Sequence, residues 1–340
     1  MNFTEILSRW YSDKKRILPW RLTKDPYYIW LSEIILQQTQ ISQGLPYYIK
    51  FVRKYPTVEA LANAKEEEVL KLWQGLGYYS RARNLLETAK YITEALSGSL
   101  PDNYKDLLRL KGVGDYTASA IASICYNESC AVVDGNVYRV LSRYFGIKTP
   151  INSTQGKKEF KALAQRLLPK TNIGDYNQAI MEFGAIQCKP KNPDCNVCPL
   201  NISCDALKSN RVDFFPVKLK AQKPIKRYIN FLVYLSNDNS TMLEKREGKG
   251  IWRGLYQFPF IETKNSASEK DIKPLVPKQY AEITLYNSED IIHKLSHQHL
   301  HTKFWIVHVN SLEEQSVKIS EIRSYPVPIL ISNFIEAFNF

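Results

Sequence analysis

Apolar residues recur at the spacing of an α-helix through the first half of this chain. From Thr4 to about Pro169 they fall in short segments that Gly or Pro closes, with no convincing period-2 stretch of strand length. The pattern changes near residue 227, because the segments 228–235 and 303–309 are rich in β-branched and aromatic residues. The segment 329–338 resembles a closing helix. The pattern predicts an all-helical part followed by a smaller α/β or α+β part.

The boundary between these parts is marked by a segment with little periodicity. Residues 205–226 contain Pro216, Pro224 and several lysines, which is typical of a linker. A chain of 340 residues also suits two domains better than one. We therefore expect a helical domain over 1–205, a linker over 206–226 and a second domain over 227–340.

The charge of the chain is concentrated in its first part. The sequence has 46 Lys and Arg against 34 Asp and Glu, and residues 1–220 hold 31 of these basic residues and 21 of the acidic ones. Such an excess is consistent with phosphate binding, although charge alone is weak support for it. No apolar run approaches the roughly 18 residues that a membrane span needs. We expect a monomeric, cytoplasmic protein without a membrane partner.

Four of the six cysteines are clustered. Cys188, Cys195, Cys198 and Cys204 follow the pattern C-x6-C-x2-C-x5-C. A disulfide framework is disfavoured in a cytoplasmic chain of this size, so the cluster predicts a metal site. Structural zinc sites usually use two short-spaced pairs of ligands, whereas three unequal gaps favour one [4Fe-4S] cluster, with zinc as the alternative. Cys125 and Cys130 lie among apolar residues and are expected to be small buried side chains.

Residues 107–124 predict a helix-hairpin-helix. Gly112, Val113 and Gly114 form a tight turn between two apolar helical segments. The glycines would let backbone N–H groups at the start of the second helix approach a phosphate oxygen, which positions DNA without reading its sequence. The alternative is an ordinary helical hairpin.

Two carboxylates are candidates for chemistry. Asp134 stands at the predicted start of a helix, where backbone donors and the helix dipole favour its ionised form. Glu33 lies in the apolar segment 30–35, where burial would raise its pKa and retain a proton. The alternative for Glu33 is a surface position in the first turn of a helix. Carboxylates in opposed environments are typical of a division between acid and electrostatic roles.

The five histidines lie between residues 293 and 308. His297, His299 and His301 alternate, so a strand would place them on one face. A metal site there is conceivable, although no Cys and few carboxylates accompany them.

Several separated motifs together resemble the adenine DNA glycosylases of the MutY type. They occur in that family's order and cover nearly the whole chain: 19–21 (PWR), 32–40 (SEIILQQTQ), 75–83 (GLGYYSRAR), 111–118 (KGVGDYTA), 134–139 (DGNVYR), the four cysteines, 250–259 (GIWRGLYQFP) and 295–297 (LSH). The resemblance implies a multidomain protein: an all-α helix-hairpin-helix glycosylase domain with a [4Fe-4S] loop over 188–204, then a smaller α/β Nudix-like domain. It also implies removal of adenine opposite 8-oxoguanine or guanine from double-stranded DNA in base excision repair.

The resemblance also implies residue roles. Glu33 would protonate the departing adenine, and Asp134 would stabilise the sugar cation beside Tyr116 and Asn136. The remaining positions fall into three groups: Trp20, Arg21 and Gln178 around the flipped adenine, Gln38 and Tyr78 beside the orphaned 8-oxoguanine, and Ser296 and His297 in a loop that senses it. Leu295 replaces the family's usual Phe in that loop.

Tyr116 also indicates the subclass. Related bifunctional glycosylases carry a Lys here, whose amine forms a Schiff base and cleaves the strand. With Tyr at this position we expect base removal with little strand cleavage. Two alternatives stay open: a bifunctional pyrimidine-lesion glycosylase and a non-catalytic DNA-binding iron–sulfur protein.

Overall fold

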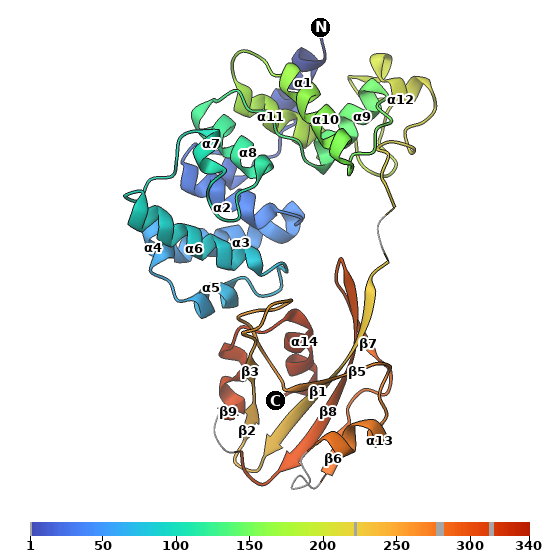
Figure 1. Ribbon diagram of the computed structural model, residues 1–340. Helices are drawn as coiled ribbons and strands as arrows, with labels where there is room; N and C mark the ends of the chain where they lie inside the picture. Colours follow the sequence, from blue (N-terminus) through green and yellow to red (C-terminus); the bar gives the residue numbers. More distant parts are fainter. Residues whose placement is uncertain (1, 221–222, 277–281, 313–315) are drawn as a thin grey trace. The chain divides into compact units, whose positions relative to one another are not determined.

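The computed structural model describes residues 2–220, 223–276, 282–312 and 316–340, and it divides into two compact units (Figure 1). The first unit consists of Met1–Asn63 and Asn84–Lys220. The second consists of Ala64–Arg83 and Ala221–Phe340, so it is assembled from two separate stretches of sequence.

The first unit is helical, as the apolar spacing predicts. Its α-helices are α1 (Phe3–Lys14), α2 (Pro26–Leu36), α3 (Ile41–Lys54), α4 (Val58–Ala62), most of α6 (Ser80–Ala95), α7 (Tyr104–Leu107), α8 (Asp115–Tyr126), α9 (Gly135–Phe145), α10 (Thr154–Arg166), α11 (Ile173–Glu182) and α12 (Asp205–Lys208). Shorter turns are η1 (Pro19–Arg21), η2 (Phe183–Gln187) and η3 (Asn201–Ser203).

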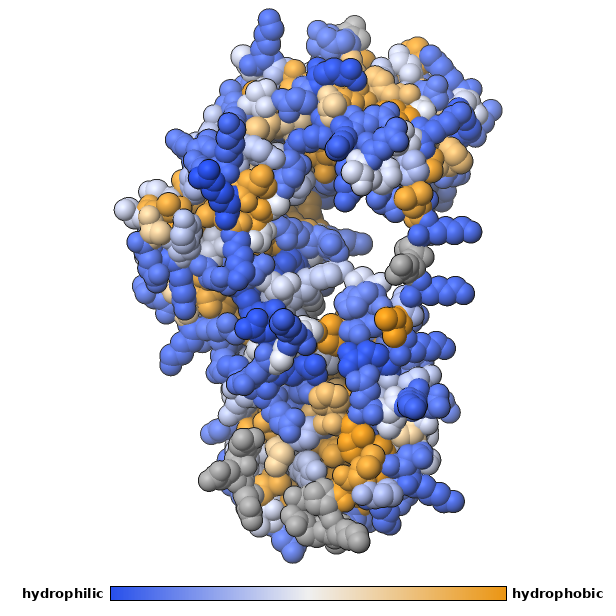
Figure 2. Space-filling model, viewed as in Figure 1, coloured by the Kyte–Doolittle hydropathy of each residue, from blue (hydrophilic) through white to orange (hydrophobic). Residues whose placement is uncertain are grey.

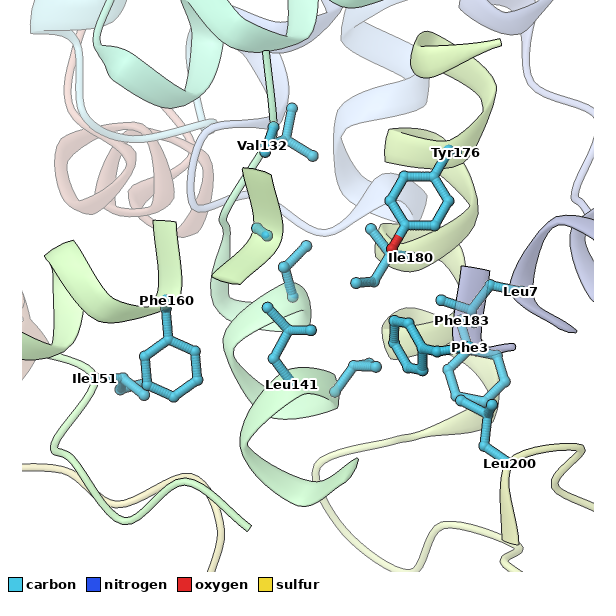
Figure 3. Packing of buried hydrophobic residues seen from close by; sticks show 14 of the residues in the cluster. Phe3, Leu7, Val132, Leu141, Ile151, Phe160, Tyr176, Ile180, Phe183 and Leu200 are labelled. Carbon is cyan, nitrogen blue, oxygen red and sulfur yellow. The ribbon is translucent and has the colours of Figure 1, made fainter. Parts of the chain in front are cut away.

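The core of the first unit packs α1, α9, α10 and α11 against one another. Leu141 of α9, Phe160 of α10, Ile180 of α11 and Leu7 of α1 are all buried in one cluster (Figure 3). Burial of large apolar side chains is the main stabilising contribution in such a core. Gly146 ends α9 in the left-handed conformation, at a φ of 67°, as a helix C-terminus favours.

The linker is shorter than predicted. Within 206–226, the backbone carbonyl of Val212 accepts a hydrogen bond of 3.0 Å from Arg143 Nε, and Val217 O accepts one of 3.0 Å from Ile151 N. The Phe215 side chain is 2% exposed. The prolines and lysines of this segment are typical of a linker, but Phe215 and the backbone carbonyls of Val212 and Val217 pack on the first unit.

The second unit contains a five-stranded sheet in the order β5-β1-β8-β6, with β7 also paired to β8. The two long central strands, β1 (Ile225–Ser236) and β8 (Gln298–Val309), are parallel, and the other pairs are antiparallel. The remaining sheet strands are β5 (Phe260–Thr263), β6 (Glu282–Leu285) and β7 (Ile291–Lys294). Two small ribbons pair β2 (Ser240–Met242) with β9 (Ser316–Lys318) and β3 (Glu244–Lys245) with β4 (Tyr256–Gln257).

Helices cover both faces of this sheet, which explains the continuous apolar runs of its central strands. Phe334 of α14 (Ile329–Phe338) stacks on Phe304 of β8 with ring centroids 4.0 Å apart. On the other face, Trp305 packs in a cluster with Ile272 of α13 (Glu269–Ile272). The predicted strands and closing helix are confirmed.

The described surface is mostly hydrophilic, with scattered hydrophobic patches on the face that Figure 2 shows. Among the described residues, no helix is both long enough and apolar enough to cross a bilayer. The remaining elements of the second unit are α5 (Glu66–Leu72), η4 (Lys273–Leu275) and η5 (Ile319–Ser324).

Candidate active site

Glu33 is buried in the first unit, so the surface alternative is wrong. It lies on α2, which is buried nearly all round, and its exposure is 8%. The pKa of Glu33 is raised to about 7, mainly by burial and also by the nearby charge of Asp134, while a hydrogen bond from Tyr116 and the charge of Arg21 lower it. A carboxyl group with this pKa carries a proton in a large fraction of molecules at neutral pH.

Tyr116 donates its hydroxyl hydrogen to Glu33 from the first turns of α8. Its hydroxyl oxygen also lies 3.2 Å from Met181 Sδ. Burial and the two carboxylates, Glu33 and Asp134, hold the pKa of Tyr116 well above its ordinary value. The phenol therefore stays neutral and acts as a donor.

Asp134 caps α9 as predicted. One carboxylate oxygen accepts from the backbone N–H of Asn136 at 2.9 Å and of Val137 at 2.8 Å, and the other accepts from Asn136 Nδ2 at 2.7 Å. Arg139 in turn donates to Asn136 Oδ1 at 2.9 Å, which fixes the amide. Burial has a larger effect than these donors, so the pKa of Asp134 lies above its ordinary value rather than below it.

Two of the three predicted adenine-pocket residues, Arg21 and Gln178, both contact Tyr11, whereas Trp20 packs on Tyr48. Trp20 is buried and contacts the Tyr48 ring edge-on at 5.1 Å. The Arg21 guanidinium lies 5.6 Å from the centre of the Tyr11 ring. The Tyr11 hydroxyl donates to Gln178 Oε1 at 3.4 Å.

Sequence reasoning missed Glu182 and Arg16. Glu182 is 1% exposed and accepts hydrogen bonds from Arg16 Nε at 2.7 Å and from an Arg21 terminal nitrogen at 2.8 Å. Burial alone would raise the pKa of Glu182, but these bonds outweigh it and lower the pKa to about 2. One signal was available, because Glu182 follows Gln178 by four residues and so shares its helix face.

Gln38 and Tyr78 both have left-handed backbones, with φ of 55° and 47°. Such conformations cost non-glycine residues on the order of 1 kcal/mol and are frequent at functional sites. Gln38 is exposed just after α2, in the first unit, and Tyr78 is 47% exposed, in the second.

The hairpin has its turn where predicted, but its first helix lies earlier in the chain. Helix α7 ends at Leu107, and turns with hydrogen bonds three residues apart continue to Val113. Gly112 has a φ of 79°, Val113 is 6% exposed, and Gly114 is the exposed N-cap of α8.

The four clustered cysteines line one cavity of about 30 Å³ together with Arg143. Arg143 is buried, and one of its terminal nitrogens donates to Cys188 Sγ at 3.4 Å. Across the described residues, no three His, Cys, Asp or Glu side chains could hold a single metal ion. All four thiols line the same cavity, as side chains that together hold one cluster would. Cys125 and Cys130 are half-buried rather than buried.

The predicted recognition loop lies in the second unit. Ser296 and His297 are exposed directly before β8, and Ser296 Oγ is 3.4 Å from His297 Nδ1. His301 pairs instead with Asp290, with Nδ1 3.3 Å from a carboxylate oxygen.

Comparisons with known proteins agree with this architecture. The family described as HhH-GPD superfamily base excision DNA repair protein matches residues 31–170, and the NUDIX domain matches residues 230–337. The adenine DNA glycosylase of Buchnera aphidicola subsp. Baizongia pistaciae is 35% identical over 308 residues, which cover 90% of this chain and 86% of that protein. The human adenine DNA glycosylase is 45% identical over 213 residues, covering 60% of this chain and 39% of that protein.

Among solved structures, a thermostable thymine-DNA glycosylase aligns with a TM-score of 0.57 at 33% identity, over 61% of this chain and 95% of that one. A non-covalent endonuclease III–DNA complex aligns at 21% identity, with a TM-score of 0.53, over 61% of this chain and 94% of that one. The predicted fold class, a helix-hairpin-helix domain followed by a Nudix-like domain, is confirmed.

Proposed function

This chain belongs to the adenine DNA glycosylase family, hydrolases of N-glycosyl bonds in base excision repair, and from that premise we propose its substrate and the roles of its residues. The substrate is adenine mispaired with 8-oxoguanine or guanine in duplex DNA. The observation that carries the proposal is the buried Glu33, whose pKa of about 7 suits a general acid at neutral pH.

Glu33 supplies the proton that lets adenine leave. The base flips out of the stack, and the protonated carboxyl transfers its proton to N7 as the glycosidic bond breaks. The hydrogen bond from Tyr116 orients the carboxyl. Trp20, Arg21 and Gln178 form the pocket around the flipped base.

Asp134 stabilises the positive charge that develops on the sugar. Its carboxylate is held by three donors, two of them from Asn136, and therefore needs little reorganisation during the reaction. Water completes the hydrolysis. Tyr116 has no amine to form a Schiff base, so the enzyme is monofunctional and leaves the strand intact.

Three further groups of residues have proposed roles: two contact the DNA, and the third binds an iron–sulfur cluster. Backbone N–H groups at the start of α8, directly after the turn 112–114, bind a phosphate. Gln38, Tyr78, Ser296 and His297 contact the 8-oxoguanine of the mispair. Cys188, Cys195, Cys198 and Cys204 would hold a [4Fe-4S] cluster, supported by their shared cavity.

A single-turnover assay tests the proposal. The purified protein is mixed with a duplex containing adenine opposite 8-oxoguanine, and the released base is identified by chromatography, with strand breakage scored before and after alkali. We expect free adenine and breakage mainly after alkali. Glu33→Gln should lower the rate by about 100-fold or more, because it cannot donate the proton.

Two comparisons make that assay decisive. Glu269→Gln removes an exposed carboxylate in the second unit and should leave the rate unchanged. A duplex with thymine opposite guanine tests the alternative of a pyrimidine glycosylase. Release of thymine but not adenine, or full activity of Glu33→Gln, would overturn the proposal.

A further inference from the structure

Helix α5 and the turn after it are bonded to the C-terminal stretch of the second unit. Gln74 Nε2 donates to Ser332 Oγ at 3.0 Å, and Gln74 Oε1 accepts from Val327 N at 3.2 Å. Lys71 Nζ donates to the carbonyl of Tyr325 at 3.1 Å. Both ends of the Gln74 carboxamide are therefore bonded at the start of α14.

A second set of contacts holds α5 against the β3–β4 ribbon. Glu67 accepts hydrogen bonds from Lys245 Nζ at 2.8 Å and from the Tyr256 hydroxyl at 2.7 Å. Gly254 also touches α5, because a Cβ at this position would lie 2.9 Å from Glu66 Oε1. Together the two sets of contacts leave little freedom for α5 to move relative to the sheet.

The turn that follows Gln74 is held by hydrogen bonds from two side chains. Gly75, Gly77 and Tyr78 all have left-handed backbones, with φ of 93°, 76° and 47°. The carbonyl of Gly77 accepts from Trp73 Nε1 at 3.0 Å and from Arg81 at 3.1 Å. These hydrogen bonds connect the backbone just before Tyr78 to Trp73, the residue before Gln74, and to Arg81.

Tyr78 lines a pocket in the second unit that Trp252, Ser296 and His297 also line. We propose that Gln74 is a positioning residue: its bonds to Val327 and Ser332 hold the turn so that Tyr78 lines one pocket with Ser296 and His297, and this sets the preference for 8-oxoguanine over guanine opposite adenine. This role rests on the proposed function. In this proposal, both stretches of the second unit, 64–83 and 221–340, take part in recognising the base opposite adenine.

The test measures discrimination rather than activity alone. Adenine release is followed under single-turnover conditions, at subsaturating enzyme, from duplexes with adenine opposite 8-oxoguanine and opposite guanine. Gln74→Leu and Ser332→Ala should each lower the ratio of the two rates about threefold to tenfold, as expected for lost hydrogen bonds. Ser332→Thr keeps the hydroxyl and should keep the ratio. Backbone amides of residues 75–79 should exchange hydrogen faster in Gln74→Leu.

Asn333→Leu, at an exposed neighbour on α14, is the matched control and should change neither readout. If Gln74→Leu fails to fold, the Ser332→Ala and Ser332→Thr pair decides. A wild type that prefers 8-oxoguanine, with variants that keep this preference, overturns the positioning role alone. A wild type that releases no adenine overturns the proposed function and this role with it.

Discussion

Glu33 illustrates how a fold can sustain an acid at neutral pH. An apolar helix buries the carboxyl, and the nearby Asp134 makes a second negative charge unfavourable, so its pKa is about 7. Tyr116 opposes both effects, because it donates to the ionised form. The resulting value is a balance among groups from three helical segments, far apart in sequence.

This balance has a cost in stability that depends on pH. The pKa of Glu33 is 4.5 in its ordinary state and about 7 in the folded protein, so ionisation opposes folding. The stability is fully present below about pH 4.5, falls as the pH rises, and is about 3 kcal/mol lower above pH 7. We expect Glu33→Gln to be more stable than wild type at pH 8, by about 1–3 kcal/mol, but not at pH 5.

Urea unfolding at the two pH values measures this difference. Glu269→Gln, in an exposed ion pair, provides the control and should differ little from wild type at either pH. A stability difference for Glu33→Gln that is the same at pH 5 and pH 8 would contradict the pKa argument.

For single residues, the sequence predicted local roles better than it predicted which distant side chains pair with each other. The apolar neighbours of Glu33 left burial and a surface position both open, whereas the position of Asp134 indicated a helix cap. Glu182 was missed because its two arginines lie more than 160 residues away in sequence, so nothing local marked it as buried and paired.

In the hairpin between α7 and α8, the two glycines are needed for different reasons. Gly112 is required by its backbone conformation, whereas Gly114 leaves space for a ligand to approach. Gly112 has a φ of 79°, and a Cβ there would come 2.9 Å from Asn84 Cβ, so only glycine fits. Gly114 has a φ of −96° and open space around its Cβ position. An alanine at Gly114 is therefore compatible with the fold.

The two glycines should respond differently to alanine. Gly112→Ala should destabilise the protein by about 1–2 kcal/mol or more, because the left-handed backbone and the contact with Asn84 both oppose it. Gly114→Ala should leave the melting temperature nearly unchanged and weaken binding to undamaged duplex, because a methyl group would stand where the phosphate approaches.

Thermal unfolding and fluorescence anisotropy with a labelled duplex give the two readouts. If Gly114→Ala binds DNA as well as wild type does, the backbone of this turn does not contact the phosphate closely.

The elements themselves were largely predictable from the sequence. Helical spacing and capping residues placed α9, and β-rich runs placed β1 and β8. Two predictions were wrong for physical reasons. After α7 the backbone N–H groups bond to carbonyls three residues earlier, so the chain continues in turns rather than as an α-helix. The segment around Phe215 packs through tertiary contacts that no local pattern encodes.

For the whole molecule, the distribution of charge along the chain predicts how affinity for DNA depends on salt. Residues 1–220 hold 31 of the 46 basic residues and 21 of the 34 acidic ones, so the excess positive charge lies mainly there. Phosphate contacts release bound counterions, which makes affinity fall steeply with salt.

We expect the affinity for undamaged duplex to fall at least about 100-fold between roughly 50 and 200 mM salt, as several phosphate contacts require. Anisotropy titrations at four or more salt concentrations measure the slope. A slope near zero would contradict phosphate binding as the main source of affinity.

The second unit is assembled from two stretches separated by Asn84–Lys220. This arrangement affects what recombination between related genes would do to the unit. A single recombination event near residue 220 would combine Gln74 from one parent gene with Val327 and Ser332 from another. The hydrogen bonds that join α5 to α14 would then connect residues with separate histories. Exchange of either stretch alone would therefore replace only one side of these hydrogen bonds, and we expect a functional exchange to require both stretches.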